Sequence, residues 1–158
     1  IILRVIWDII QVKLAKEKLM RHIKISFDSR QIPIPALIDT GNSLHDPISN
    51  MPVVIVEYLA IKEILPSEIQ RIFSERVNED LSKLSSLLSG SSWYSRFRLI
   101  PFSSLGKENG MLIGFKPDNL EIQDSDERKD VKDVIVGIYN RTLSRNESYR
   151  ALLSPELA

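Results

Sequence analysis

The sequence predicts a mainly β protein with helical insertions. Short segments that alternate apolar and polar residues, or are continuously apolar, outnumber the segments with helical periodicity. The strand-like segments do not alternate regularly with helices, which argues against a doubly wound parallel sheet. The length of 158 residues suits one domain with a hydrophobic core of its own.

Composition excludes several classes of site. The 21 basic residues are balanced by 21 acidic ones, which argues against the basic surface of a nucleic-acid-binding protein. Near-zero net charge also makes self-association easier. The chain has no cysteine and two histidines, which excludes disulfides, thiol nucleophiles, cysteine-ligated metals and a multi-histidine metal site within one chain. We therefore expect no metal or organic cofactor.

An amphipathic linker helix is expected over 1–21, ahead of the main domain at 22–158. The stretch 13–24 carries five basic residues against one acidic residue, Glu17. It is either a solvated helix face or a segment next to a membrane on the cytoplasmic side. Because the sequence starts at Ile1 rather than Met, we expect a fragment or processed product that follows a membrane domain.

A β-hairpin leads into the first segment of chemical interest. Residues 23–27 alternate apolar and polar side chains, 28–31 have turn composition, and 32–38 form a second strand. The prolines of this second strand predict an edge or bulged position for its start. The hairpin ends at Asp39.

Helices and further strands follow the hairpin. Helices are predicted over 57–65 and 67–88, separated by Pro66. A charged loop is predicted over 123–133 and a helix from 139 to 143. Strands are predicted at 53–56, 97–102, 111–115, 119–122 and 131–137.

The acid Asp39 comes directly after the apolar run Ala36-Leu37-Ile38. A carboxylate at the end of a buried strand needs a reason, because an ionised acid is costly to desolvate. Gly41 permits a turn that a side chain would obstruct, and Thr40 offers a hydroxyl that can fix the loop. This pattern predicts an acid held rigidly at the end of a strand.

One such carboxylate needs a partner. Two carboxyl groups about 3 Å apart share one proton, so that one acts as base on a water and the other polarises a carbonyl. The sequence has no second Asp-Thr-Gly and no internal repeat. The second carboxylate must then be Asp39 of another subunit, which a two-fold homodimer supplies. We therefore expect an aspartic endopeptidase.

A second segment strengthens this hypothesis. The run Val134-Ile135-Val136-Gly137 is an apolar strand that ends in glycine before the predicted helix. Together with the Asp39 motif it resembles one half of a retroviral-type (retropepsin) aspartic protease. The resemblance implies a closed barrel with one half-site per chain. It also implies that the second strand threads the loop bearing the acid, where Gly137 lets the backbones approach.

The chain departs from the retropepsin pattern. Retropepsins usually carry Ala or Ser where this chain has Asn42, and an Arg that helps to organise the dimer where it has Ile138. The segment 57–95 is longer and more helical than their flap region. The candidate flap is 89–97, because a flap needs a mobile tip and apolar contacts to substrate. The expected substrate contacts are Asn42, Ser43, Trp93 and Tyr94.

A closer resemblance rests on three short motifs. Asp39-Thr40-Gly41-Asn42, Asp46-Pro47 and Gly114-Phe115-Lys116-Pro117-Asp118 resemble the sporulation sigma-E factor processing peptidases of endospore-forming bacteria. That resemblance implies a multi-span membrane domain followed by a protease domain that faces the cytoplasm. It implies removal of the prosequence from an inactive sigma factor precursor, triggered by a secreted signalling protein.

Other interpretations stay open at this stage. The same barrel could be a non-catalytic interaction module, or Asp39 could be the nucleophile of another hydrolase, although no phosphate loop or metal cluster accompanies it. His45 is expected to be a loop residue rather than part of a triad, and Asp46 a turn former. Trp93 and Tyr94 are equally compatible with the core.

Overall fold

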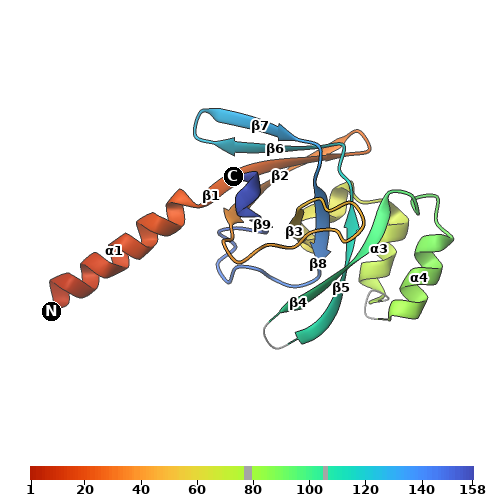
Figure 1. Cartoon of the computed structure of the whole chain (residues 1–158), viewed down its shortest axis with the longest axis horizontal. Coiled ribbons are helices and arrows are strands. Elements are labelled where there is room, and N and C mark those ends of the chain that lie inside the picture. Colours follow the sequence, from red (N-terminus) through yellow and green to blue (C-terminus); the bar gives the residue numbers. More distant parts are fainter. Residues whose placement is uncertain (77–79, 105–106) are drawn as a thin grey trace.

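A computed structural model describes residues 1–76, 80–104 and 107–158 of the chain (Figure 1). Its strands form one sheet in the order β4-β5-β8-β3-β9-β2-β1-β6-β7. The strands are β1 Met20–Phe27, β2 Arg30–Ile38, β3 Val53–Glu57, β4 Phe97–Ser104, β5 Lys107–Phe115, β6 Asn119–Asp124, β7 Glu127–Val131, β8 Ile135–Tyr139 and β9 Ala151–Leu153. The helices are α1 Ile2–Lys18, α2 Tyr58–Ile61, α3 Ser67–Ser74, α4 Leu81–Ser89 and the 3-10 turns η1 Lys62–Ile64 and η3 Pro155–Leu157.

The mainly β class with helical insertions is confirmed, but the expected closed barrel is wrong. The sheet is open, and β4 and β7 lie at its opposite ends without pairing to each other in the described chain. The residues of these edges explain why. The first four residues of β7 are charged and exposed, which opposes pairing with another strand. Pro101 in β4 has no backbone N–H to donate to a further neighbour.

The hairpin of β1 and β2 confirms the β-hairpin predicted over 23–38. Phe27 pairs with Arg30, and the two turn residues Asp28 and Ser29 have φ of 49° and 63°. Such positive values suit a two-residue hairpin turn. The proline at 33 lies in the part of β2 before β9 joins it at Ala36, so this part is an edge as predicted.

Strands β7 and β9 were not predicted, and one predicted helix is absent. The charged segment 123–133 contains β7, because charged residues on both faces of an exposed edge strand hide its periodicity. The short strand β9 has only three residues, too few for any pattern. The helix predicted at 139–143 is wrong, since Tyr139 ends β8 and residues 140–143 form an irregular segment with bends. There the Leu143 N–H donates to the Glu57 carboxylate at 2.7 Å instead of to a helical carbonyl.

The predicted helix 67–88 is in fact two helices. α3 ends at Ser74, and Arg76 has a positive φ of 56° that no helix accommodates. α4 begins after Asp80, whose carboxylate accepts a hydrogen bond from the Lys83 N–H at 3.3 Å.

The main core packs α2, α3 and α4 against the sheet. Its centre is aromatic: the Phe27 ring lies 4.8 Å from that of Phe115, 5.8 Å from that of Phe97 and 5.7 Å from that of Trp93. The buried residues that α2, η1, α3 and α4 contribute to this core are Ala60, Ile61, Ile64, Ile69, Ile72, Phe73, Leu84 and Leu88. A smaller cluster contains Val53, Ile100, Leu112 and Ile135, of which Leu112 lines the pocket beside Asp39.

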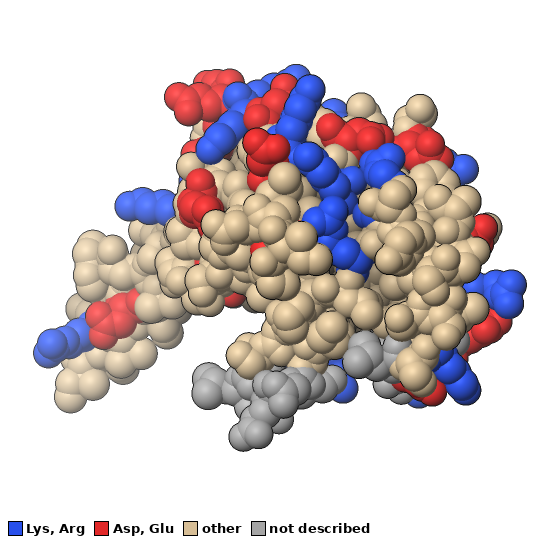
Figure 2. All heavy atoms as spheres, turned by 45° about the vertical axis from the view of Figure 1, so that its right-hand side comes forward, with Lys and Arg blue, Asp and Glu red and all other residues tan. Residues whose placement is uncertain are grey.

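The helix predicted at the N-terminus is present, but it does not join the core. α1 buries none of its residues and extends away from the sheet (Figure 1). The face of α1 visible in Figure 2 is largely uncharged, whereas charged side chains gather at the top of the molecule over β6 and β7. Its exposed apolar residues are Ile2, Leu3, Val5, Ile6, Trp7, Ile9, Ile10, Val12 and Leu14. Among the described residues, no helix has the length and apolarity needed to cross a membrane.

Candidate active site

Asp39 lies immediately after β2, on a loop that hydrogen bonds hold in place. Its backbone N–H donates to the Leu153 carbonyl at 2.9 Å, and its own carbonyl accepts from the Asn42 N–H at 3.0 Å. The carboxylate Oδ1 accepts from the Gly41 N–H at 2.9 Å. A Cβ at position 41 would lie 3.3 Å from that oxygen, closer than most real contacts. Gly41 therefore allows its own amide to orient the partly buried acid.

The strand that threads this loop is not the expected one. β9 lies between β2 and β3, so the chain from β2 through Asp39 to β3 runs around it. The strand containing 134–137 instead pairs with β3 in parallel and with β5 in antiparallel orientation. The expectation that 134–137 threads the Asp39 loop is thus wrong. β9 lies at this position because it pairs with β2 and β3, which are distant in the sequence. Its three residues are too few to predict this pairing from the sequence.

Asn42 faces inward and ties the loop to both strands beside it. Its side chain is buried, and its Nδ2 donates to the Val53 carbonyl at 3.1 Å and to the Leu152 carbonyl at 3.5 Å. Its Oδ1 accepts from the Leu44 N–H at 3.2 Å. An Ala or Ser could not span these partners. The amide at this position therefore fixes the loop that carries Asp39.

The other loop-support residues lie in different surroundings. Thr40 is exposed, and its hydroxyl makes no hydrogen bond within the described part of the chain. Gly137 pairs with Gly114 on β5. A Cβ on Gly137 would lie 3.1 Å from Val53 and 3.2 Å from Leu112. Gly137 thus leaves room for these two side chains, of which Leu112 lines the Asp39 pocket.

A pocket of about 580 Å³ opens beside Asp39. The loop forms one wall, β4 forms another, and the segment after β8 closes a third side. Of the described lining residues, Asp39 is the only carboxylate. The lining residues are Asp39, Gly41, Asn42, Ser43, Leu44, His45, Ile55, Pro101, Phe102, Ser103, Leu112, Tyr139, Thr142, Leu143 and Leu152. The lining combines apolar and polar side chains, and a concave pocket with convergent polar groups is a candidate ligand site.

Trp93 and Tyr94 lie away from this pocket. Trp93 is partly buried against the Phe27 ring. Tyr94 is 62% exposed and lines a separate hollow with Ile48 and Leu99. The segment facing Asp39 is the β4–β5 hairpin, through Phe102 and its neighbours. The strands predicted at 97–102 and 111–115 correspond to this hairpin, but no sequence signal placed it against Asp39; residues 105–106 between β4 and β5 lie outside the described residues.

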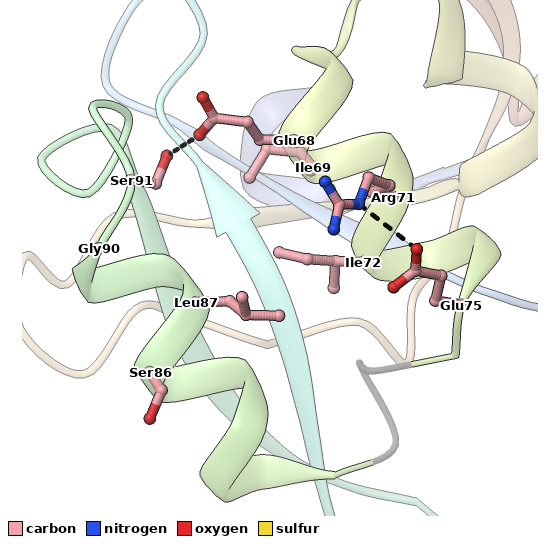
Figure 3. A pocket seen from close by; sticks show the side chains of 9 residues that line it. All are labelled: Glu68, Ile69, Arg71, Ile72, Glu75, Ser86, Leu87, Gly90 and Ser91. Carbon is pink, nitrogen blue, oxygen red and sulfur yellow. Dashed lines mark hydrogen bonds and ion pairs between the residues drawn. The ribbon is translucent and has the colours of Figure 1, made fainter.

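A second hollow, of about 300 Å³, lies between α3 and α4 (Figure 3). Ile72 and Leu87 extend toward each other from the two helices. The acids at its rim are engaged: Glu75 pairs with Arg71 at 3.4 Å, and Glu68 accepts from the Ser91 hydroxyl at 2.5 Å. No group of three or more acidic or histidine side chains that could hold a metal occurs among the described residues.

His45 and Asp46, which follow Leu44 on the loop, make structural contacts. His45 Nε2 lies 2.6 Å from Glu156 Oε1, which ties the loop to the C-terminal turn. Asp46 forms the turn that was predicted, since its carbonyl accepts from the Asn50 N–H at 2.8 Å. Its carboxylate is 1% exposed and accepts from the Ser49 hydroxyl at 2.6 Å and from Arg98 Nη1 at 2.7 Å.

The Asp46 carboxyl should make stability depend on pH. Burial alone would raise its pKa, but the hydrogen bonds from Ser49 and Arg98 outweigh burial and lower the pKa below its ordinary value. A lowered pKa in the folded state adds stability above the unfolded pKa of about 4, and this stability is lost as pH falls through the folded pKa. We therefore expect Asp46→Asn to flatten the fall in melting temperature below about pH 4. Asp126→Asn, at an exposed turn, should keep the wild-type slope; equal slopes for both variants would contradict this assignment.

Comparison with known proteins gives a consistent result. The family Peptidase_U4, described as sporulation factor SpoIIGA, matches residues 1–157. A sporulation sigma-E factor-processing peptidase of Priestia megaterium is 32% identical over 140 residues, which cover 85% of this chain and 43% of the relative. A probable sporulation sigma-E factor-processing peptidase of Clostridium acetobutylicum is 30% identical over 152 residues, which cover 96% of this chain and 46% of the relative.

A shorter relative matches over most of its own length. A putative sporulation sigma factor-processing peptidase of Bacillus thuringiensis subsp. kurstaki is 29% identical over 136 residues, covering 85% of this chain and 81% of the relative. By contrast, the chain spans less than half the length of the Priestia and Clostridium proteins. No solved structure matches the chain.

Proposed function

The chain belongs to the Peptidase_U4 family of the sporulation factor SpoIIGA, and from this premise we propose that it is the aspartic protease unit of a sigma factor-processing peptidase. The names of its relatives support a protease role in sporulation. The observation that carries the aspartic mechanism is the placement of Asp39. It is the only carboxylate among the described residues of the pocket, and the Gly41 amide holds it in position.

The proposed reaction is hydrolysis of a peptide bond by an activated water. Two Asp39 carboxyl groups, one from each subunit, share a proton across a two-fold axis. The ionised one removes a proton from the water, while the protonated one donates a hydrogen bond to the scissile carbonyl. In this mechanism Gly41 and Asn42 fix the geometry of the loop and Gly137 supports the pocket floor. Thr40 stays a proposed support residue.

The homodimer follows from the mechanism and agrees with the exposure of the loop. Thr40, Gly41 and Ser43 beside Asp39 are exposed, so a second copy can approach the acid without displacing core residues. Ile138 stands where retropepsins carry an Arg that helps to organise their dimer. We therefore propose a retropepsin-like half-site on an open sheet, with a dimer that relies on other contacts.

The pocket indicates the substrate side chains. Its walls carry Leu44, Ile55 and Phe102 beside the acid, so apolar residues next to the scissile bond are the expected fit. Ser43 remains the proposed polar contact on the loop. We assign the covering role to the β4–β5 hairpin, because Trp93 and Tyr94 lie elsewhere.

The proposed biological setting follows from the relatives. The substrate would be the sigma-E factor precursor, whose prosequence the enzyme removes in response to a secreted signalling protein. An N-terminal membrane domain would hold the protease unit on the cytoplasmic side of the cell membrane. The exposed apolar residues of α1, followed by Lys16 and Lys18 in its last turn, support a place beside a membrane surface.

The direct experiment is cleavage of the sigma-E precursor by the membrane-linked protein. We expect wild type to yield one shortened product, identified by mass spectrometry, and Asp39→Ala to yield none. A non-catalytic module would instead keep its function after the same substitution. Cleavage by Asp39→Ala at the wild-type rate would end the aspartic protease proposal.

A further inference from the structure

Asp46 and Arg98 form an ion pair whose acid is buried and fully engaged. The Asp46 carboxylate is 1% exposed and lies 2.7 Å from Arg98 Nη1. Its Oδ2 also accepts from the Ser49 hydroxyl and N–H, at 2.6 and 3.2 Å, and its Oδ1 from the Ile48 N–H at 3.5 Å. A buried carboxylate with this many donors is held in one orientation. The arginine is therefore held as well.

The pair joins two walls of the Asp39 pocket. Asp46 lies on the loop seven positions after Asp39, while Arg98 lies on β4, three positions before Pro101 in the opposite wall. In the described chain it is the only ion pair between the 39–52 loop and the β4–β5 hairpin. Because β4 is an edge strand with β5 as its one neighbour, no strand on its other side fixes its distance from the loop.

We propose that Asp46 and Arg98 are positioning residues that set the spacing between the Asp39 loop and the β4–β5 hairpin, and so the width of the substrate pocket. Neither residue lines the pocket, so their effect passes through Pro101, Phe102 and Ser103. The role as a determinant of substrate binding rests on the proposed function. The role in spacing rests on the structure alone.

Removing both charges tests the pair without leaving a buried charge unpaired. The double variant Asp46→Asn/Arg98→Gln keeps polar groups at both positions but loses the ionic attraction. Its matched control is Asp118→Asn/Arg96→Gln. Arg96 lies two residues earlier and pairs with Asp118 at 2.8 Å, but this pair does not contact the loop.

The first readout needs no activity. The chain has no cysteine, so Ser43→Cys and Ser103→Cys place spin labels only on the loop and the hairpin, both at exposed positions. We expect the distance distribution between the labels to broaden and lengthen in the Asp46→Asn/Arg98→Gln background and to stay as in wild type in the control. An unchanged distribution in a folded Asp46/Arg98 variant would overturn the proposal. If the double variant does not fold, Arg98→Lys decides by the same measurement.

The second readout separates positioning from stability. We expect kcat/KM for the sigma-E precursor to fall by about 10- to 100-fold, mainly through a higher KM, because a displaced wall misplaces the substrate. Arg98→Lys should recover part of the loss, and the control pair should cleave as wild type does. Equal losses of kcat/KM in the Asp46/Arg98 and Asp118/Arg96 double variants would show that the effect is one of stability. They would overturn the role of Asp46 and Arg98 in substrate binding. If instead Asp39→Asn cleaves like wild type, the proposed function fails while the label distances still decide the spacing.

Discussion

Asp39→Asn is expected to lower processing of the sigma-E precursor by at least about 100-fold, the lower range of what general acid–base groups contribute. Asparagine has the shape of aspartate, and its carbonyl oxygen can still accept the Gly41 N–H that Asp39 Oδ1 accepts at 2.9 Å. It cannot accept a proton from water or share one with a second carboxyl group. The loss should therefore fall on catalysis and leave the fold in place.

Stability and a distant acid provide the controls for Asp39→Asn. Thermal unfolding of the variant should match wild type, since the Asp39 backbone bonds to Leu153 and Asn42 do not involve the side chain. Asp126→Asn, at the exposed turn between β6 and β7, should process the precursor at the wild-type rate. Wild-type processing by Asp39→Asn would show that another group does the chemistry.

Phe27→Ala should be among the most destabilising single substitutions, by about 3–5 kcal/mol. The Phe27 side chain is fully buried, contacts the rings of Trp93, Phe97 and Phe115, and lies 4.5 Å from the Arg96 guanidinium. Truncation removes all of these contacts and leaves a cavity. The free energy of unfolding, measured with denaturant, gives the effect directly.

Phe102→Ala is the matched control for Phe27→Ala, because it removes the same ring from the Asp39 pocket. Phe102 is only partly buried, so its loss should cost less stability and mainly weaken processing. The pair of variants also distinguishes the two aromatic sites, since Trp93 packs with Phe27 and not with Phe102. A larger loss of stability for Phe102→Ala than for Phe27→Ala would contradict this division between core and pocket.

The parts of the fold that the sequence predicted are those whose pattern is local. The β1–β2 hairpin alternates apolar and polar residues around a turn, and both features are encoded within 20 residues or so. β9 is the opposite case, because Ala151–Leu153 becomes a strand only by pairing with β2 and β3. β7 escaped prediction because exposure on both faces removes the alternation that identifies a strand.

The candidate site divides in the same way. Asp39 and Gly41 could be identified because the acid, its turn and the preceding strand are contiguous. The pocket wall could not, since it depends on which distant hairpin the fold brings to the loop. Arg98 lies 52 positions from Asp46, and no local rule pairs them. Trp93 and Tyr94 suited a flap by composition, but the packing of Trp93 on Phe27 places them elsewhere.

The most direct test of the central claim mixes live and dead subunits of the membrane-linked protein. Wild type and Asp39→Asn are co-assembled in varying ratios, and the rate of sigma-E precursor cleavage is measured at constant total protein. If each site needs one Asp39 from each of two subunits, the rate should follow the square of the live fraction, reaching about one quarter at equal amounts. A rate that falls only in proportion to the live fraction, to about one half, would show that one subunit suffices and would contradict the shared site.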